Sequence, residues 1–319
     1  MKFRSFNDSA RPAFTLFELM VVIAIVGILI GMLLPAIQMV REGARNLKCK
    51  NNLRQISVAL HNFESAHQEF PTNGWGYFWH GDPDFGVGTK QPGGWIYQSL
   101  AFLEHLNLAE IGSGLPDSDR ADALKEVSQT AIETFNCPSR RSANPYPYTA
   151  TVSLRNCNFE DVGAKTDYAI NGGDTVIAGT LGPLDFEQFA THEWIDFEKA
   201  NGIAFVQMTV GFADIRDGSS NTIMVGEKSL AVANYTTGNT IGDDQTMFIG
   251  DDADNRRWGY RSPVPDRVDE DIEAFGGPHP GVCNFVFADA SVRSISNEIN
   301  EQTMMNLSNR KDGNIQNEF

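Results

Sequence analysis

The longest uninterrupted apolar stretch of the chain lies close to its N-terminus. No charged side chain occurs from residue 19 to residue 40, where Leu, Ile, Val and Met predominate. As an α-helix rising about 1.5 Å per residue, this stretch spans about 33 Å, enough to cross the hydrocarbon core of a bilayer. A buried core helix rarely stays apolar on every face, and the apolar part of a secretory signal usually has only about 7–15 residues. The pattern therefore predicts a transmembrane helix.

Beyond residue 40 the apolar positions continue at helical spacing, but on one face only. The positions that share this face are Asn46, Cys49, Leu53, Ile56, Leu60 and Phe63. Such 3-4-3-4 spacing is typical of an amphipathic helix. We expect the helix to extend over residues 41–70, with a globular domain packed on its apolar face and Cys49 buried or bonded there.

The pattern then changes to loops and shorter helices. Residues 72–94 are rich in Gly, Pro and aromatic residues. The aromatic side chains there could stack on sugar rings or, equally, cover the core; they are Trp75, Tyr77, Phe78 and Trp79. Helices are expected at 95–110 and 119–135, the second with Asp117 or Ser118 as its N-cap.

The second half of the chain alternates short apolar runs with turns. Runs rich in β-branched and aromatic residues predict strands at 202–210, 221–228 and 281–289. A further run at 292–295 follows Asp289-Ala290-Ser291, which predicts a hairpin. The expected fold class is α+β, a long N-terminal helix with an antiparallel sheet, and the polar tail should fray.

Charge and cysteine content narrow the function. A formal net charge of −16 argues against nucleic acid as a partner. The four cysteines are widely spaced and form no C-x-x-C pair, so a zinc ribbon is not expected; they are Cys49, Cys137, Cys157 and Cys283. In an exported domain they could form two disulfides, with three possible pairings.

The N-terminal stretch FTLFELMVVIAIVGILIGMLLPAIQ resembles the signature of type IV prepilins and type II secretion pseudopilins. The resemblance implies that a prepilin peptidase cleaves between Ala13 and Phe14 and that Phe14 is then methylated. It implies that Glu18 is an assembly contact, because a carboxylate at the membrane edge requires a positive partner such as a neighbour's new N-terminus. By the same resemblance, Pro35 is a proline that loosens the helix. The class usually has Gly before the cut, where this chain has the small residue Ala13.

Five further segments, in order, extend the resemblance over nearly the whole chain. They are CKNNLRQISVALHNFESAHQEFP (49–71), GWIYQSLAFLEH (94–105), FNCPS (135–139), DGSSNTIMVGE (217–227) and HPGVCNFVFADASVR (279–293). Together they resemble a large bacterial family of prepilin-leader proteins whose main domain has no known function, loosely grouped with solute-binding proteins. Because Cys49 and Cys137 lie in these segments, the resemblance implies that they pair, which leaves Cys157 with Cys283.

The family ends in a signature of His, nine residues and Asp-Gly. Here His279 and Asp289 keep the spacing, but Ala290 replaces Gly. A positive φ would cost Ala290 about 1–2 kcal/mol, so we expect a different turn. His279 and Asp289 could form a catalytic or metal dyad, but turn chemistry favours a structural role.

Two polar segments are further candidate sites. DGSSNT (217–222) could hold a ligand, although its composition is also that of a turn, which is favoured. Asp251, Asp252 and Asp254 are calcium candidates within an acidic cluster that also contains Asp243 and Asp244. The spacing is not that of an EF-hand, so a solvated acidic loop is the preferred interpretation. No nucleophile elbow, P-loop, dinucleotide motif or H-E-x-x-H occurs, so neither an enzyme nor a cofactor is expected.

These observations predict a single-pass inner-membrane protein with a periplasmic or extracellular domain. The expected divisions are a cleaved leader (1–13), a transmembrane helix (14–40), its amphipathic extension (41–70), an α+β domain (71–308) and a polar tail (309–319). Its expected role is a subunit of a type IV pilus or type II secretion-like pseudopilus. The partners would be the membrane, prepilin peptidase and other pilin-like subunits. The alternative is a membrane-tethered glycan- or solute-binding protein; a hydrolase is the least favoured.

Overall fold

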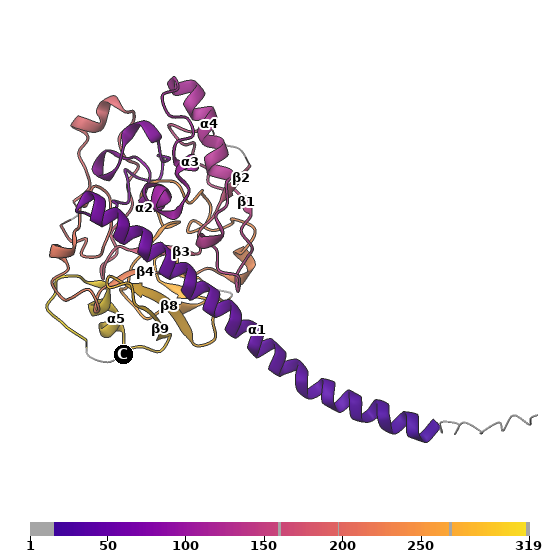
Figure 1. Ribbon diagram of the computed structural model, residues 1–319. Helices are drawn as coiled ribbons and strands as arrows, with labels where there is room; N and C mark the ends of the chain where they lie inside the picture. Colours follow the sequence, from indigo (N-terminus) through magenta and orange to yellow (C-terminus); the bar gives the residue numbers. More distant parts are fainter. Residues whose placement is uncertain (1–15, 159–160, 197, 268–269, 317–319) are drawn as a thin grey trace, which may run out of the picture. The chain divides into compact units, whose positions relative to one another are not determined.

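The computed structural model describes residues 16–158, 161–196, 198–267 and 270–316 (Figure 1). The chain forms two compact units, the first ending at Ala44 and the second beginning at Arg45. Ala13 and Phe14, the expected cleavage junction, lie outside the described residues.

Helix α1 (Leu16–His67) is 52 residues long and passes from the first unit into the second. The part of this helix from residue 19 to residue 40 carries no charged side chain and is not buried within the protein. By length and composition this helix could cross a membrane. The helix continues through Pro35 without interruption.

Within the second unit, α1 buries the predicted face. Cys49, Leu53, Ile56, Leu60 and Phe63 are all buried, while Asn46 is half-buried. The helix ends at His67, before the expected residue 70, because Gln68 adopts a left-handed conformation with φ 64°. Polar bonds add to the apolar packing: the Asn284 side chain donates to that of Asn46 (2.9 Å).

The central sheet of the second unit has five strands in the order β5-β3-β4-β8-β9. Its pairs are antiparallel except β3–β5, which is parallel, so the predicted antiparallel sheet is mixed at one edge. The strands are β3 (Tyr168–Asn171), β4 (Ile223–Glu227), β5 (Arg256–Arg257), β8 (Val282–Phe287) and β9 (Val292–Ser296). Two small sheets pair β1 (Pro145–Pro147) with β2 (Val162–Ala164) and β6 (Val264–Pro265) with β7 (Gly276–Gly277). The α+β class is confirmed.

The predicted strand at 202–210 is not formed. Its apolar side chains are buried, among them Phe205 and Val206. Its backbone bonds to loops and, through the Ile203 and Ala204 N–H groups, to the single carbonyl of Asn171 at the end of β3, so no ladder forms. Gln207 adopts a φ of 55°, which interrupts an extended conformation. The apolar run therefore belongs to the hydrophobic core, but its interpretation as a strand was wrong.

The predicted helix at 95–110 is broken into α2 (Trp95–Ser99), the 3₁₀ turn η3 (Leu100–Leu103) and α3 (Leu106–Ala109). The break follows from Glu104, whose φ of 65° ends the first part. Helix α4 (Asp117–Gln129) starts and ends earlier than predicted, and η4 (Glu133–Phe135) follows it separately. Pro116, rather than Asp117 or Ser118, occupies its N-cap position. The remaining helical segments are η1 (Pro83–Phe85), η2 (Gly88–Lys90), η5 (Glu187–Thr191), η6 (Phe212–Asp214), η7 (Val232–Asn234) and α5 (Glu301–Ser308).

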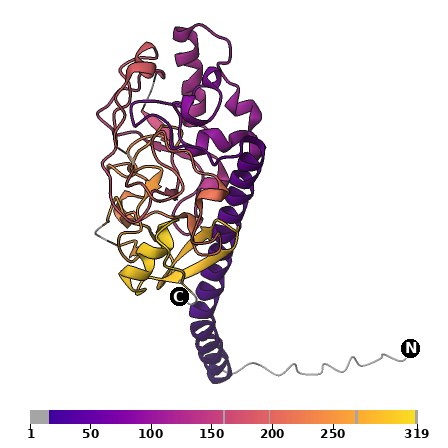
Figure 2. The same ribbon diagram turned by 90° about the vertical axis from the view of Figure 1, so that its left-hand side faces the viewer.

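The predicted hairpin joins β8 to β9, and both views place the pair beside α1 (Figures 1 and 2). Ala290 adopts a φ of 64°, so the expectation of a different turn was wrong. The turn is held by the Ala290 N–H, which donates to the Phe287 carbonyl (2.9 Å), and by the Ser291 N–H, which donates to Asp289 Oδ1 (2.8 Å). These bonds offset the left-handed strain at Ala290.

The aromatic loop is part of the core. Trp75 and Trp79 are each 1% exposed and pack together edge to face. Phe186 packs against both of them, and Phe189 stacks on Trp75. These indole rings therefore cover the core and are not exposed for stacking on a sugar.

The first residues of the polar tail are ordered. Arg310 is buried and donates to the carbonyls of Ala200 and Gly202.

Candidate functional site

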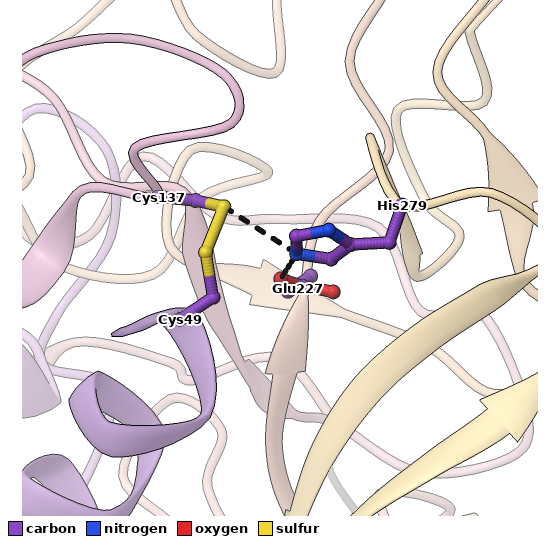
Figure 3. A group of neighbouring side chains, drawn as sticks. All are labelled: Cys49, Cys137, Glu227 and His279. Carbon is purple, nitrogen blue, oxygen red and sulfur yellow. Dashed lines mark hydrogen bonds and ion pairs between the residues drawn. A yellow bond between two sulfur atoms is a disulfide. The ribbon is translucent and has the colours of Figure 1, made fainter. Parts of the chain in front are cut away.

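Four buried side chains with metal- and redox-type atoms meet beside the sheet. They are Cys49, Cys137, Glu227 and His279, each no more than 1% exposed (Figure 3). Their sulfur, carboxylate and imidazole atoms all lie within 4.8 Å of one another. Among the described residues, no other group of three or more His, Cys, Asp and Glu side chains has this geometry.

Two of the four residues form a disulfide. Cys49 lies on the buried face of α1, and Cys137 lies just after η4, with a Cα–Cα distance of 5.2 Å. The Cys137 N–H donates to Asp167 Oδ2 (2.7 Å), which anchors the loop after η4 to the residue just before β3. The predicted pairing of Cys49 with Cys137 is therefore present in the structure.

The other two residues are brought together by the sheet. Glu227 ends β4 and His279 precedes β8, and these strands are antiparallel, so the end of one lies beside the start of the other. His279 Nε2 lies 3.1 Å from Glu227 Oε1 and 3.6 Å from Cys137 Sγ. Figure 3 shows one imidazole nitrogen facing both the Cys137 sulfur and the Glu227 carboxylate.

The Glu227 carboxylate is held firmly. Its Oε2 accepts the Asn284 N–H (2.8 Å), and its Oε1 lies 3.3 Å from the Asn284 side-chain amide, which donates to it. A Cβ on Gly277 of β7 would stand 2.8 Å from Oε2, so a side chain at that position would push the carboxylate aside. The carboxylate is thus oriented toward His279 by backbone and side chain together.

Neighbouring groups stay protonated near neutral pH. Burial, followed by the Glu227 carboxylate, raises the pKa of the Cys283 thiol well above its usual value. The same two causes, in the same order, raise the pKa of the Tyr168 hydroxyl. A buried thiol of this kind is unreactive as a nucleophile.

The predicted pairing of Cys157 with Cys283 is wrong. Both are free and buried, in different hydrophobic clusters. Cys157 Sγ lies 3.4 Å from the hydroxyl of Ser128 in α4, and burial raises its pKa to about 11. Cys283 Sγ donates to the Glu227 carbonyl (3.7 Å).

His279 and Asp289 do not form a dyad. They lie at opposite ends of β8, and Asp289 caps the hairpin turn at Ser291. A turn role for Asp289 fits the structural interpretation, but His279 belongs to the buried cluster. Sequence reasoning missed Glu227; its signal was a single acidic residue at the end of the apolar run TIMVGE.

The expected solvated acidic loop is instead largely buried, and two of its carboxylates, Asp243 and Asp251, are ion-paired. Asp243 accepts from Arg141 (2.5 and 2.9 Å) and Lys228 (2.8 Å), with all three side chains buried. Burial alone would raise the pKa of Asp243, but Arg141 and Lys228 hold it below its usual value. Asp251, one of the calcium candidates, is paired with Arg256 (2.8 Å).

The other two calcium candidates, Asp252 and Asp254, lie near Asp244, where burial and the neighbouring carboxylates outweigh the positive charge of Lys165. Burial, and then the Asp254 carboxylate, raises the pKa of Asp244 to about 8, and the pKa values of Asp252 and Asp254 are also raised, first by burial. Asp244 and Asp252 line a cavity of about 360 Å³.

The segment 217–222 forms a turn that holds the tail. Asp217 is buried, and its two carboxylate oxygens accept the N–H groups of Asp312 (2.7 Å) and Gly313 (2.8 Å). These bonds use the oxygens that a ligand would need, which supports the turn interpretation.

Comparisons with known proteins give two matches. Residues 9–34 match the model of the prokaryotic N-terminal methylation motif, and residues 38–302 match a family described as a protein of unknown function (DUF1559). No curated protein matches the chain, and no solved structure does. With the apolar α1, the methylation motif makes this a membrane-anchored, single-pass, pilin-like protein. Because the second match covers most of its length, the chain belongs to the DUF1559 family.

Proposed function

We propose that this protein is a subunit of a type IV pilus or of a type II secretion-like pseudopilus. In this proposal it is anchored in the inner membrane by the first part of α1, with the globular unit exported. The observation that carries the proposal is the methylation motif over residues 9–34, which overlaps the exposed apolar helix. A prepilin peptidase would cleave before Phe14 and leave a charged amine near the start of that helix.

The assembly contact would be Glu18. It lies in the first turn of α1, directly before the apolar stretch, with its side chain exposed. Apolar side chains around it would pack on the same stretch of neighbouring subunits, and its carboxylate would pair with the Phe14 amine of a neighbour. Removing one partner of a buried pair costs about 3–5 kcal/mol, whereas an exposed pair contributes at most about 1 kcal/mol.

The test is a comparison of wild-type and Glu18→Gln chains in native membranes. A photoreactive amino acid at Ile30 would report crosslinking between subunits at matched expression. We expect Glu18→Gln to leave membrane insertion and leader removal unchanged and to lower crosslinking at least about tenfold. Glu126→Gln, the same change on the exposed face of α4, is the control and should leave crosslinking unchanged.

Equal crosslinking in both chains would contradict the assembly role. The alternative is a membrane-tethered binding protein, and one observation favours it. The cavity of about 360 Å³ is lined by Tyr77, Asp244, Asp252 and Arg256, which offer an aromatic ring, carboxyl groups and a guanidinium to a polar ligand.

A further inference from the structure

We propose that Cys49, Cys137, Glu227 and His279 form a four-ligand site for a divalent metal ion of the zinc class when the Cys49–Cys137 disulfide is reduced. In the oxidised chain the two sulfurs bond to each other and have no thiolate charge to donate. The same four residues would therefore have two exclusive states, a disulfide and a metal site. This inference does not depend on the pilus proposal.

The donor set suits zinc. Zinc in proteins is bound by thiolates, imidazole nitrogens and carboxylates, and closed structural sites have four protein ligands. Here two sulfurs, one imidazole nitrogen and one carboxylate oxygen converge from four separate parts of the chain. Cys49, Cys137, Glu227 and His279 each come from a different one of the five segments that resemble the family.

The spacing also suits zinc. With bonds of about 2.0–2.3 Å, a tetrahedral zinc holds a nitrogen and a sulfur about 3.5 Å apart and a nitrogen and an oxygen about 3.3 Å apart. His279 Nε2 lies 3.6 Å from Cys137 Sγ and 3.1 Å from Glu227 Oε1. Two edges of the tetrahedron are therefore already in place, and the main adjustment is separation of the two sulfurs after reduction.

The surroundings favour a cation once the sulfurs are thiolates. Two thiolates and the Glu227 carboxylate would place three negative charges in a buried site, and buried charges need compensation. A divalent ion supplies two positive charges. Asn284 donates twice to Glu227, and Asp167 fixes the Cys137 backbone, so both ligands are held by hydrogen bonds as ligands of metal sites usually are.

The change between the states balances as thiol–disulfide exchange. A dithiol reductant attacks the disulfide, transfers two electrons and becomes a disulfide itself, while Cys49 and Cys137 become thiols. Metal binding then displaces their two protons. Oxidation by a disulfide-bearing protein reverses the exchange and releases the ion.

The test uses the full chain in detergent, oxidised or reduced with a phosphine, which is not a thiol ligand. Cobalt(II) is the spectroscopic probe. We expect the reduced chain to bind one cobalt ion with the visible bands of a tetrahedral site and sulfur-to-cobalt charge-transfer bands, and the oxidised chain to show neither. Glu227→Gln and His279→Gln should weaken binding at least about 100-fold, beyond the loss of an outer-shell partner.

Two controls keep the result specific. Cys283→Ser removes a buried thiol adjacent to the cluster, and Asp289→Asn changes the other half of the His-x9-Asp spacing. Both should bind cobalt as the wild type does. Sulfur-to-cobalt bands of equal strength in the oxidised chain, or their absence in the reduced chain, would overturn the proposal.

A melting measurement covers the case in which reduction loosens the fold. Zinc at about 100 times its dissociation constant should raise the melting temperature of the reduced chain by roughly 5 °C or more. It should leave the oxidised chain unchanged. A reduced chain whose melting temperature does not respond to zinc would equally overturn the metal site.

Discussion

His279 and Glu227 face each other inside the globular unit, with His279 Nε2 3.1 Å from Glu227 Oε1 and both side chains shielded from solvent. They are 52 residues apart and meet because β4 and β8 are antiparallel neighbours. The contact links the end of one strand to the start of another, directly beside the disulfide that joins α1 to the loop after η4.

A double-mutant cycle should show strong coupling between these two residues. We expect Glu227→Gln and His279→Gln each to destabilise the fold, and their coupling to exceed about 1 kcal/mol, because both lie where water cannot replace the lost partner. Chemical unfolding of the wild type, both single variants and the double variant in detergent measures this coupling free energy. The exposed pair Lys48–Glu133 is the matched control and should couple by less than about 1 kcal/mol. Coupling no larger than in the control would contradict the buried contact.

Loss of the disulfide should destabilise the chain. Cys49 and Cys137 are 88 residues apart, so their bond restricts the unfolded chain strongly. We expect the double variant Cys49→Ser/Cys137→Ser to lose about 2–5 kcal/mol of unfolding free energy in metal-free buffer. Cys157→Ser, which removes a free buried thiol, should cost less. If the two losses are equal, the effect comes from burying a hydroxyl and not from the crosslink.

The contribution of Asp244 to the stability of the fold should fall as the pH rises toward 8. The pKa of Asp244 is raised to about 8 in the folded chain, whereas an unfolded aspartate titrates near 3.8. The folded chain therefore binds the proton more tightly, so this contribution to stability is full below about pH 4 and is lost as the pH rises to about 8. Asp244→Asn should flatten melting temperature against pH over that range. Asp122→Asn, an exposed carboxyl in α4, should not. A wild-type chain that becomes more stable from pH 5 to pH 8 while the Asp244→Asn chain does not would show that the sign is wrong.

Glycine should be better than alanine in the β8–β9 turn. Ala290 has a φ of 64°, which costs a residue with a Cβ about 1–2 kcal/mol, and glycine removes that cost. We expect Ala290→Gly to stabilise the fold by about 1 kcal/mol after the added freedom of the unfolded chain is counted. Ala121→Gly in α4 should do the opposite, by about 1 kcal/mol. A loss at both positions would mean that Ala290 carries no strain.

The mature chain should begin at Phe14 with a methylated amine. The reason is the match to the methylation motif over residues 9–34, which includes the Ala13–Phe14 junction. Mass spectrometry of protein from membranes reads the N-terminus directly, and Ala13→Gly should be processed at least as fully as the wild type. A mature N-terminus at Ile37, as after a conventional signal-peptidase cut, would contradict both the anchor and the pilin-like role.

Periodicity and composition determined the elements that depend on neighbours in the sequence. The apolar stretch, the buried face from Cys49 to Phe63 and the hairpin through Ala290 all follow from local spacing. The same local rules failed where an isolated backbone angle decided the outcome. Glu104 interrupted a helix, and Gln207 lies in an apolar run that forms no strand. Neither Glu104 nor Gln207 is a residue type that indicates a left-handed conformation.

Tertiary structure decided the site. The sequence pointed to His279 with Asp289, ten residues on, but a strand between them places the two at opposite ends of β8. Glu227 meets His279 because antiparallel pairing joins segments 52 residues apart. The acidic loop gave no sequence sign of burial, since Arg141, which neutralises Asp243, is 102 residues away. Sequence spacing carries the period of a helix or strand, whereas the partners of buried charges are set by which elements pack together, and that depends on the whole chain.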